Sequence, residues 1–140
     1  MRQPLFKRLL GPDVATEEVD PHSVEGGLVK AEYPLVEGAA RTRVEQFTAG
    51  RVCSRAALGR FGVAAATPIL RTEDRAPIWP PGFVGSISHT DSWCAAAVAR
   101  AEDVRALGID LEPSTPLKEA LWRRVCTAAE REHLRELTAP

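Results

Sequence analysis

A 140-residue chain in which 44% of the residues are hydrophobic and 26% are charged has the composition of one ordinary globular domain. This length is enough to bury a core without metal or disulfide staples. The formal net charge of −1 excludes the basic footprint of a nucleic-acid binder, so any phosphate site must be local. Because the chain shows no apolar leader and no run of about 18 apolar residues, we expect neither secretion nor a membrane span.

The cysteine content indicates a reducing compartment. Cys53, Cys94 and Cys126 are odd in number, so they do not form a complete set of disulfides. They also lack the Cys-x-x-Cys spacing of zinc sites. We therefore expect free thiols and a cytoplasmic protein.

The amino-terminal part of the chain shows a weak pattern followed by a helical one. No hydrophobic period is sustained early on, so we expect 1–23 to be an irregular segment and 24–140 to form the domain. Residues 26–33 are predicted as a short strand. Pro34 suits the first position of a helix, and apolar residues then recur at spacings of four, four and three. This spacing predicts an amphipathic helix over 34–48.

A glycine and a proline-rich loop punctuate the next part of the chain. Gly50 is expected to interrupt the helix before a second helical segment at 51–61. Residues 66–70 are predicted as another strand. The three prolines of the loop at 77–82 exclude regular helix there.

Three strands are predicted in close succession, at 84–90, 92–100 and 105–112. Short polar turns join them, so a local antiparallel meander is expected. Further on, Thr127 and Glu130 have the spacing of a capping box, which predicts a helix from about residue 128 to 136.

The strand predicted at 105–112 carries two acids on one face. Side chains alternate across a strand, so Asp110 and Glu112 point away from the face that holds the apolar side chains. Two oxygen ligands roughly 6–7 Å apart along the backbone suit Mg²⁺, which fills its coordination sphere with water and phosphate oxygens. The pair therefore predicts a magnesium site that takes a phosphate substrate.

Each candidate residue also has an ordinary structural explanation. Taken alone, Asp110 and Glu112 would be surface charges on the solvated face of an antiparallel strand. A single imidazole such as His89 is more often a half-buried histidine than a ligand. Glu130 would be a helix cap. The functional hypothesis therefore depends on the combined pattern.

That combined pattern resembles a known enzyme family. From Trp79 the chain reads WPPGFVGSISHTDSWCAAAVARAEDVRALGIDLEP. This is similar to the W-P-x-G-x-x-G-S-I-S-H, A-x-V-A and G-I-D-x-E segments of the 4'-phosphopantetheinyl transferases of the surfactin-type and enterobactin synthase component D branch. Residues 43–58 resemble the family's R-x-x-E-F-x-x-G-R-x-C-A-R-x-A-L pattern, with Gln46 in place of glutamate, and 122–130 resemble its W-x-x-V-x-T-x-x-E. The resemblance covers residues 32 to 136.

The resemblance implies an α+β fold of the α/β sandwich type, with two similar halves about a pseudo-twofold axis. The first half, an antiparallel sheet with flanking helices, is expected to be whole and the second only begun. The family continues into a helix bearing F-S-x-K-E-x-x-Y-K, and this chain ends at Pro140 without that segment. We therefore expect either a fragment of a longer enzyme or a truncated product, and both remain open.

The family chemistry implies roles for the acids. Mg²⁺ on Asp110 and Glu112 would hold the pyrophosphate of coenzyme A while a serine of an apo acyl or peptidyl carrier protein takes the 4'-phosphopantetheine. Glu130 is a further candidate for a catalytic base or a supporting acid. The complete enzyme is expected to be a monomer. The carrier could belong to siderophore, polyketide, nonribosomal peptide or fatty-acid synthesis.

Coenzyme A also needs groups that bind its phosphates outside the metal site, and guanidinium groups and histidine suit this role. The residues expected to contact coenzyme A are Arg43, Arg51, Arg71, Arg75, Ser88 and His89.

Two rival functions use the same residues differently. A truncated homologue would bind coenzyme A without transferring anything. A structural or partner-holding domain that inherited the fold would need no metal. Continuation of the gene into the F-S-x-K-E segment, and stronger coenzyme A binding with Mg²⁺, would separate the three.

Overall fold

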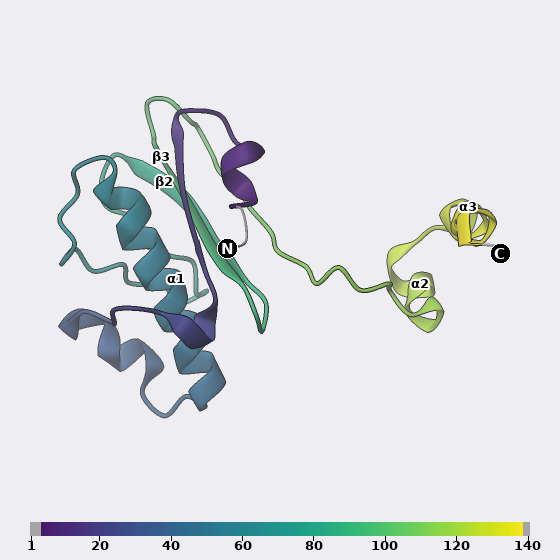
Figure 1. Ribbon diagram of the computed structural model, residues 1–140, viewed down its shortest axis with the longest axis horizontal. Helices are drawn as coiled ribbons and strands as arrows, with labels where there is room; N and C mark the ends of the chain where they lie inside the picture. The colour runs from purple at the N-terminus through teal and green to yellow at the C-terminus, as the bar shows by residue number, and fades with distance from the viewer. Residues whose placement is uncertain (1–3, 139–140) are drawn as a thin grey trace.

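The computed structural model describes residues 4–138 and centres on a three-stranded antiparallel sheet (Figure 1). The strand order is β1-β3-β2, with β1 at Val14–Val19, β2 at Phe83–His89 and β3 at Cys94–Arg100. The long helix α1, Arg41–Gly59, covers one face of the sheet, and a short 3-10 helix at Phe6–Arg8 lies on the other side (Figure 1). The expected α+β fold with an antiparallel sheet and flanking helices is confirmed. The remaining elements are 3-10 helices at Pro21–Ser23 and Lys30–Val36, and helices α2 at Glu119–Val125 and α3 at Ala128–Thr138.

Small side chains in the central strand bring the layers close together. Every residue of β3 from Cys94 to Ala99 is fully buried, at 0% exposure. Val98 of this strand joins a core cluster in which Leu58 of α1 and Ile69 of the following loop are also fully buried. Alanines at the centre of the sheet therefore leave room for the helix on one face.

Helix α1 differs from the prediction of two helices at 34–48 and 51–61. It begins at Arg41 and runs unbroken through Gly50 to Gly59. Gly50 faces the sheet, where an added Cβ would lie 3.0 Å from Ile87 Cγ2. The glycine therefore permits close helix–sheet contact, and that contact offsets its low helix propensity.

Three predicted strands were wrong, those at 26–33, 66–70 and 105–112. Residues 26–33 contain no strand; a 3-10 helix begins at Lys30 and buries Glu32 in the interior. In place of a strand at 66–70 there is one isolated bridge between Arg71 and Pro77.

The segment 105–112 is extended but has no backbone ladder to β2. Instead the amides of Ile109 and Leu111 donate to the hydroxyl oxygens of Ser86 and Ser88, at 3.1 and 2.9 Å. The side chains of β2 therefore hold the segment where carbonyl groups would hold a fourth strand.

The segment 1–23, expected to be irregular, contains β1. This strand pairs with β3 along its whole length, from Val14 opposite Ala99 to Val19 opposite Cys94. Two adjacent glutamates interrupt the alternation of apolar and polar residues that would have predicted this strand. On this edge strand Glu17 pairs with Arg60, and Glu18 accepts hydrogen bonds from the Phe6 amide and the Trp93 indole.

The strands predicted at 84–90 and 92–100 are confirmed as β2 and β3, and the helix at 128–136 is confirmed as α3. Helix α2 was not predicted. Together α2 and α3 stand away from the sheet at the end of the extended segment (Figure 1). Between residues 4 and 138 no helix is long and apolar enough to cross a membrane.

We predict that Gly85→Ala destabilises the fold. An added Cβ would lie 2.6 Å from Trp79 Cζ2 and 2.8 Å from the Ala97 carbonyl oxygen, so the ring that covers the sheet must move. Overpacking of this kind typically costs about 1–3 kcal/mol of unfolding free energy. Chemical denaturation measures the loss. Gly59→Ala is the matched control, because nothing lies within 4 Å of its added Cβ; equal stability of the two variants would contradict the role assigned to Gly85.

Candidate functional site

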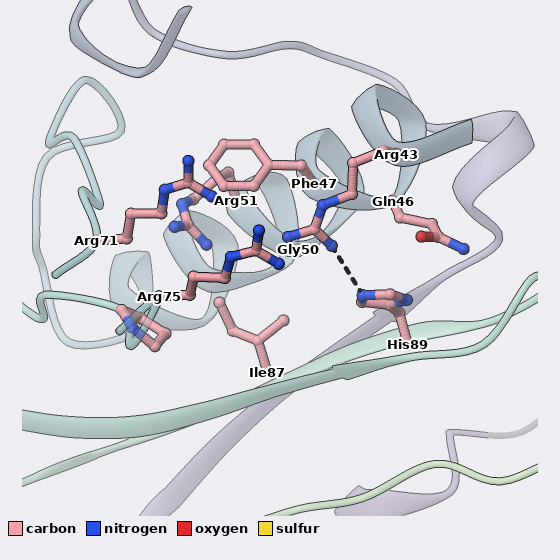
Figure 2. A pocket seen from close by; sticks show the side chains of 10 residues that line it. Arg43, Gln46, Phe47, Gly50, Arg51, Arg71, Arg75, Ile87 and His89 are labelled. Carbon is pink, nitrogen blue, oxygen red and sulfur yellow. Dashed lines mark hydrogen bonds between the residues drawn. The ribbon is translucent and has the colours of Figure 1, made fainter. Parts of the chain in front are cut away.

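A pocket of about 180 Å³ lies between the first half of α1, the end of β2 and the loop that follows α1 (Figure 2). Each of these elements supplies basic side chains to it. The residues that line the pocket are Arg43, Gln46, Phe47, Gly50, Arg51, Arg71, Arg75, Pro77, Ile87 and His89.

Helical and strand periods explain why these side chains converge. On α1, Arg43, Phe47 and Gly50 follow one another at spacings of four and three, which places them on one face. On β2, Ile87 and His89 are two residues apart and share the face that meets α1. The pocket is therefore a product of the contact between helix and sheet.

The pocket is strongly cationic. Four arginines and a histidine line it, and none of the lining side chains in the described part of the chain is acidic. Guanidinium groups present planar, fixed donors that suit phosphate oxygens. The guanidinium groups of Arg43, Arg51, Arg71 and Arg75 gather over Ile87 (Figure 2). This arrangement favours a phosphate or another compact anion.

Arg51 is largely buried, at 5% exposure, and serves partly as an anchor. Its Nε donates to the Ile69 carbonyl at 2.6 Å and its Nη2 to the Leu70 carbonyl at 3.4 Å, and its guanidinium stacks 4.2 Å from the Phe47 ring centroid. Burial lowers the pKa of Arg51 to about 10, partly offset by Glu32 and reinforced by neighbouring arginines. Arg51 therefore remains charged at neutral pH.

A buried ion pair, which sequence reasoning missed, holds the same loop. Glu32 is fully buried, and both of its carboxylate oxygens accept from Arg55 Nη1 at 2.7 Å. The carboxylate also accepts from the amides of Ile69 and Val29, at 2.9 and 3.0 Å. The spacing of Arg51 and Arg55, one turn apart on a helix, is the only sequence signal for this network. Glu32 itself gave none.

The surroundings of His89 favour its neutral form. Burial and then the charge of Arg43 lower its pKa from the ordinary value of 6.5, while Asp91 raises it. Arg43 Nη1 lies 3.4 Å from His89 Nε2 (Figure 2). Because a guanidinium only donates, Nε2 accepts in this contact and the ring proton is assigned to Nδ1.

Ser88 and Asp110 lie on the other face of the sheet from His89. Ser88 Oγ donates to Asp110 Oδ1 at 3.0 Å, and the Leu111 amide also donates to that carboxylate oxygen at 3.0 Å. Successive residues of a regular strand point to opposite faces, and β2 stays regular to its last residue. The predicted Ser88–His89 pair is therefore divided between two faces.

Asp110 and Glu112 are both exposed, whereas Ile109 and Leu111 are half-buried. The alternation expected of the acids is thus present without a strand. Residues 4–138 include no group of three or more histidine, cysteine or acidic side chains that could hold a metal ion. Two carboxylates are a hard oxygen donor set, and they fit Mg²⁺ when water and phosphate oxygens complete its coordination.

Glu130 acts as a helix cap in this structure. Its carboxylate accepts from the Thr127 amide at 2.7 Å, and its own amide donates to Thr127 Oγ1 at 3.3 Å. Hydrogen bonds from Thr127 lower the pKa of Glu130. Because α3 stands away from the sheet, Glu130 is not brought to the pocket (Figure 1).

The structure therefore brings together five of the nine residues predicted for the site, namely Arg43, Arg51, Arg71, Arg75 and His89. Sequence reasoning missed the pocket roles of Phe47 and Ile87, although their helical and strand periods could have placed them beside Arg43 and His89.

Comparisons with known proteins identify relatives of this chain. Residues 31–99 match the 4'-phosphopantetheinyl transferase N-terminal domain. The chain is 43% identical to 4'-phosphopantetheinyl transferase Svp of Streptomyces mobaraensis over 86% of this chain and 47% of that protein. It is 34% identical to enterobactin synthase component D of Escherichia coli K12, over 73% of this chain and 48% of that protein. The chain thus spans about half the length of the curated relatives it matches.

A solved structure shares the fold. It is a holo-(acyl-carrier-protein) synthase from Bacillus anthracis, in complex with CoA (3',5'-ADP), with a TM-score of 0.55 and 18% sequence identity. The match covers 63% of this chain and 94% of that one. The matched domain and the curated relatives show that the chain belongs to the 4'-phosphopantetheinyl transferase superfamily.

Proposed function

We propose that this protein transfers 4'-phosphopantetheine from coenzyme A to a serine of an apo acyl or peptidyl carrier protein, with Mg²⁺. The observation that carries the proposal is the pocket in which four arginines and a histidine converge without an acid. Coenzyme A has a 3'-phosphate apart from its pyrophosphate, and a cationic pocket suits that isolated dianion. The similarity in fold to a synthase in complex with CoA (3',5'-ADP) supports this ligand.

The pocket's size restricts which part of the ligand it takes. At about 180 Å³ it is smaller than the 300–1,000 Å³ typical of sites that enclose a drug-sized ligand. We assign it to the 3'-phosphate, with Arg43, Arg71 and Arg75 as direct contacts. Arg51 contributes charge while it anchors the loop.

The remainder of coenzyme A must extend beyond the pocket. Strand β2 is an edge strand and ends at His89, so a ligand can pass from one face of the sheet to the other around this end. On the far face it meets Ser88 and Asp110. A 3'-phosphate at the arginines and a pyrophosphate near Asp110 and Glu112 then belong to one molecule.

The proposed reaction breaks one phosphorus–oxygen bond and forms another. The carrier serine oxygen attacks the β-phosphate of coenzyme A, its proton passes to a base, and 3',5'-adenosine bisphosphate leaves with its bonding electron pair. Bound at Asp110 and Glu112, Mg²⁺ would neutralise charge on the pyrophosphate. The arginines hold the leaving bisphosphate by its 3'-phosphate. Three free cysteines suit a reducing cytoplasm, where we place the reaction.

Incubation with coenzyme A, Mg²⁺ and an apo-carrier domain, followed by the intact mass of the carrier, tests the function. The proposal expects the carrier to gain the mass of one 4'-phosphopantetheine. A second candidate, a coenzyme A-binding protein without transfer, is favoured by the pair of carboxylates that stands without a third metal-binding side chain in residues 4–138. Tight coenzyme A binding with an unchanged carrier mass would select it. Absence of coenzyme A binding would contradict both.

We predict that Asp110→Asn and Glu112→Gln remove the gain in coenzyme A affinity that Mg²⁺ provides. The amide that replaces the Asp110 carboxylate keeps an acceptor for Ser88 but removes the charge that attracts the cation. Calorimetric titrations with and without Mg²⁺ measure the difference. Affinity without the metal should not fall, because the lost carboxylates only repel the pyrophosphate when no cation lies between them. Glu102→Gln, an exposed acid before the same segment, is the control; an undiminished Mg²⁺ effect in both site variants would place the metal elsewhere.

We predict that the His89 titration reports the charges around it. NMR should give a midpoint below 6.5 in the free protein. Arg43→Ala should raise the His89 pKa, because it removes a cation that disfavours protonation, and Asp91→Asn should lower it. Bound 3',5'-adenosine bisphosphate should raise the pKa, because the added negative charge favours the imidazolium. A His89 midpoint that the bound ligand does not move would show that the phosphate binds elsewhere. A midpoint that neither variant moves would contradict the charge contacts assigned to Arg43 and Asp91.

A further inference from the structure

The loop that carries two of the pocket arginines forms a small hairpin over residues 70–78. The Ile78 amide donates to the Leu70 carbonyl at 3.0 Å, and the Thr72 amide donates to the Ala76 carbonyl at 2.9 Å. Arg71 and Arg75 both reach the pocket from this hairpin (Figure 2). The hairpin is therefore the only part of the pocket wall outside α1 and β2 among the described residues.

Arg75 holds an unfavourable backbone conformation. Its φ of 71° lies in the left-handed region, and no other non-glycine residue in the described part of the chain has a positive φ. A three-residue hairpin loop of this kind commonly places glycine at its last position. For an L-residue with a side chain the left-handed region costs roughly 1–2 kcal/mol. Such an outlier beside a binding pocket indicates a functional constraint on the side chain.

Thr72 closes the turn around Arg75. Thr72 Oγ1 accepts from the Ala76 amide at 3.1 Å and donates to Asp74 Oδ1, and the Thr72 carbonyl accepts from the Arg75 amide at 3.0 Å. These bonds fix the residues on both sides of Arg75. Without them the arginine could relax to a negative φ, which would redirect its side chain.

We propose that Thr72 is a positioning residue, whose hydroxyl holds Arg75 in the left-handed conformation so that its guanidinium reaches the phosphate in the pocket. The inference rests on the proposed binding of a coenzyme A phosphate there. The turn holds Arg75 in a strained conformation that is already oriented before the anion binds. Ordering this side chain on binding therefore costs less.

The test uses the whole chain and two probes, adenosine 3',5'-bisphosphate and adenosine 5'-monophosphate, titrated calorimetrically. The ratio of their dissociation constants defines the 3'-phosphate preference. Arg75→Ala should lower this preference by about tenfold or more, as expected for loss of a charge-assisted bond. Thr72→Val should lower it by about fivefold, and should have no further effect once Arg75 is alanine. Thr72→Ser keeps the hydroxyl and should restore the preference.

Glu73→Gln, exposed in the same turn, is the matched control and should retain the preference of the native protein.

Melting temperatures measured without ligand test the strain in the turn. Arg75→Gly should melt about 2–4 °C above Arg75→Ala, because both remove the guanidinium but glycine accepts a positive φ without strain. Thr72→Val should lower the melting temperature more when residue 75 is glycine than when it is arginine, because only the arginine turn regains strain energy when the hydroxyl bonds are lost.

Two outcomes overturn the inference. Thr72→Val that keeps the native preference while Arg75→Ala loses it would show that the hydroxyl does not position the arginine. Arg75→Gly that melts at or below Arg75→Ala would show that the turn holds no strain. If the native protein shows no 3'-phosphate preference, the proposed ligand is wrong, and the melting comparison alone then decides whether Thr72 restrains Arg75.

Discussion

The buried carboxylate of Glu32 is the constraint on which the pocket depends. It accepts two bonds from Arg55 and one from the Ile69 amide, so it joins the 3-10 helix, α1 and the loop after α1 at one point. Breaking a buried pair by removing one partner commonly costs about 3–5 kcal/mol, because the other charge is left without compensation. Arg51 fixes the neighbouring carbonyl groups of the same loop. The hairpin that carries Arg71 and Arg75 therefore starts from an anchored position.

The sheet separates two kinds of chemistry. On the α1 face, the pocket collects positive charge from helix, hairpin and strand. On the other face, Ser88 holds Asp110 through a hydrogen bond. A ligand that bears two separate phosphate groups would reach both faces if it passed the end of β2. This arrangement is consistent with coenzyme A, whose 3'-phosphate and pyrophosphate lie at different positions of one molecule.

The sequence supports the basic site better than it supports the backbone around it. Arg43 and His89 were predicted as neighbours of a phosphate, and the helical and strand periods explain why both reach one pocket. The strand predicted at 105–112 was wrong, because alternating burial requires only an extended chain with one covered side. The amides of this segment donate to serine hydroxyls and not to carbonyl groups. The hydrophobic period of the sequence is the same in both cases, so it cannot distinguish them.

Long-range burial explains the other differences. Arg51 was predicted as a ligand contact, and its part as an anchor follows from the position of Ile69, which no local pattern specifies. In the same way, glycine occurs at helical position 50 because the side chain of Ile87 occupies the space that a Cβ would need. Local propensity favoured a helix end there, and contact with the sheet reversed it.

The most direct test of the central claim, that the cationic pocket binds a phosphate of coenzyme A, is an NMR titration that follows arginine Nε and histidine side-chain signals. We expect 3',5'-adenosine bisphosphate to shift the signals of Arg43, Arg75 and His89 together, with one saturation curve. Adenosine 5'-monophosphate should shift them far less. Shifts confined to the arginines of α2 and α3, or equal responses to the two nucleotides, would contradict the claim.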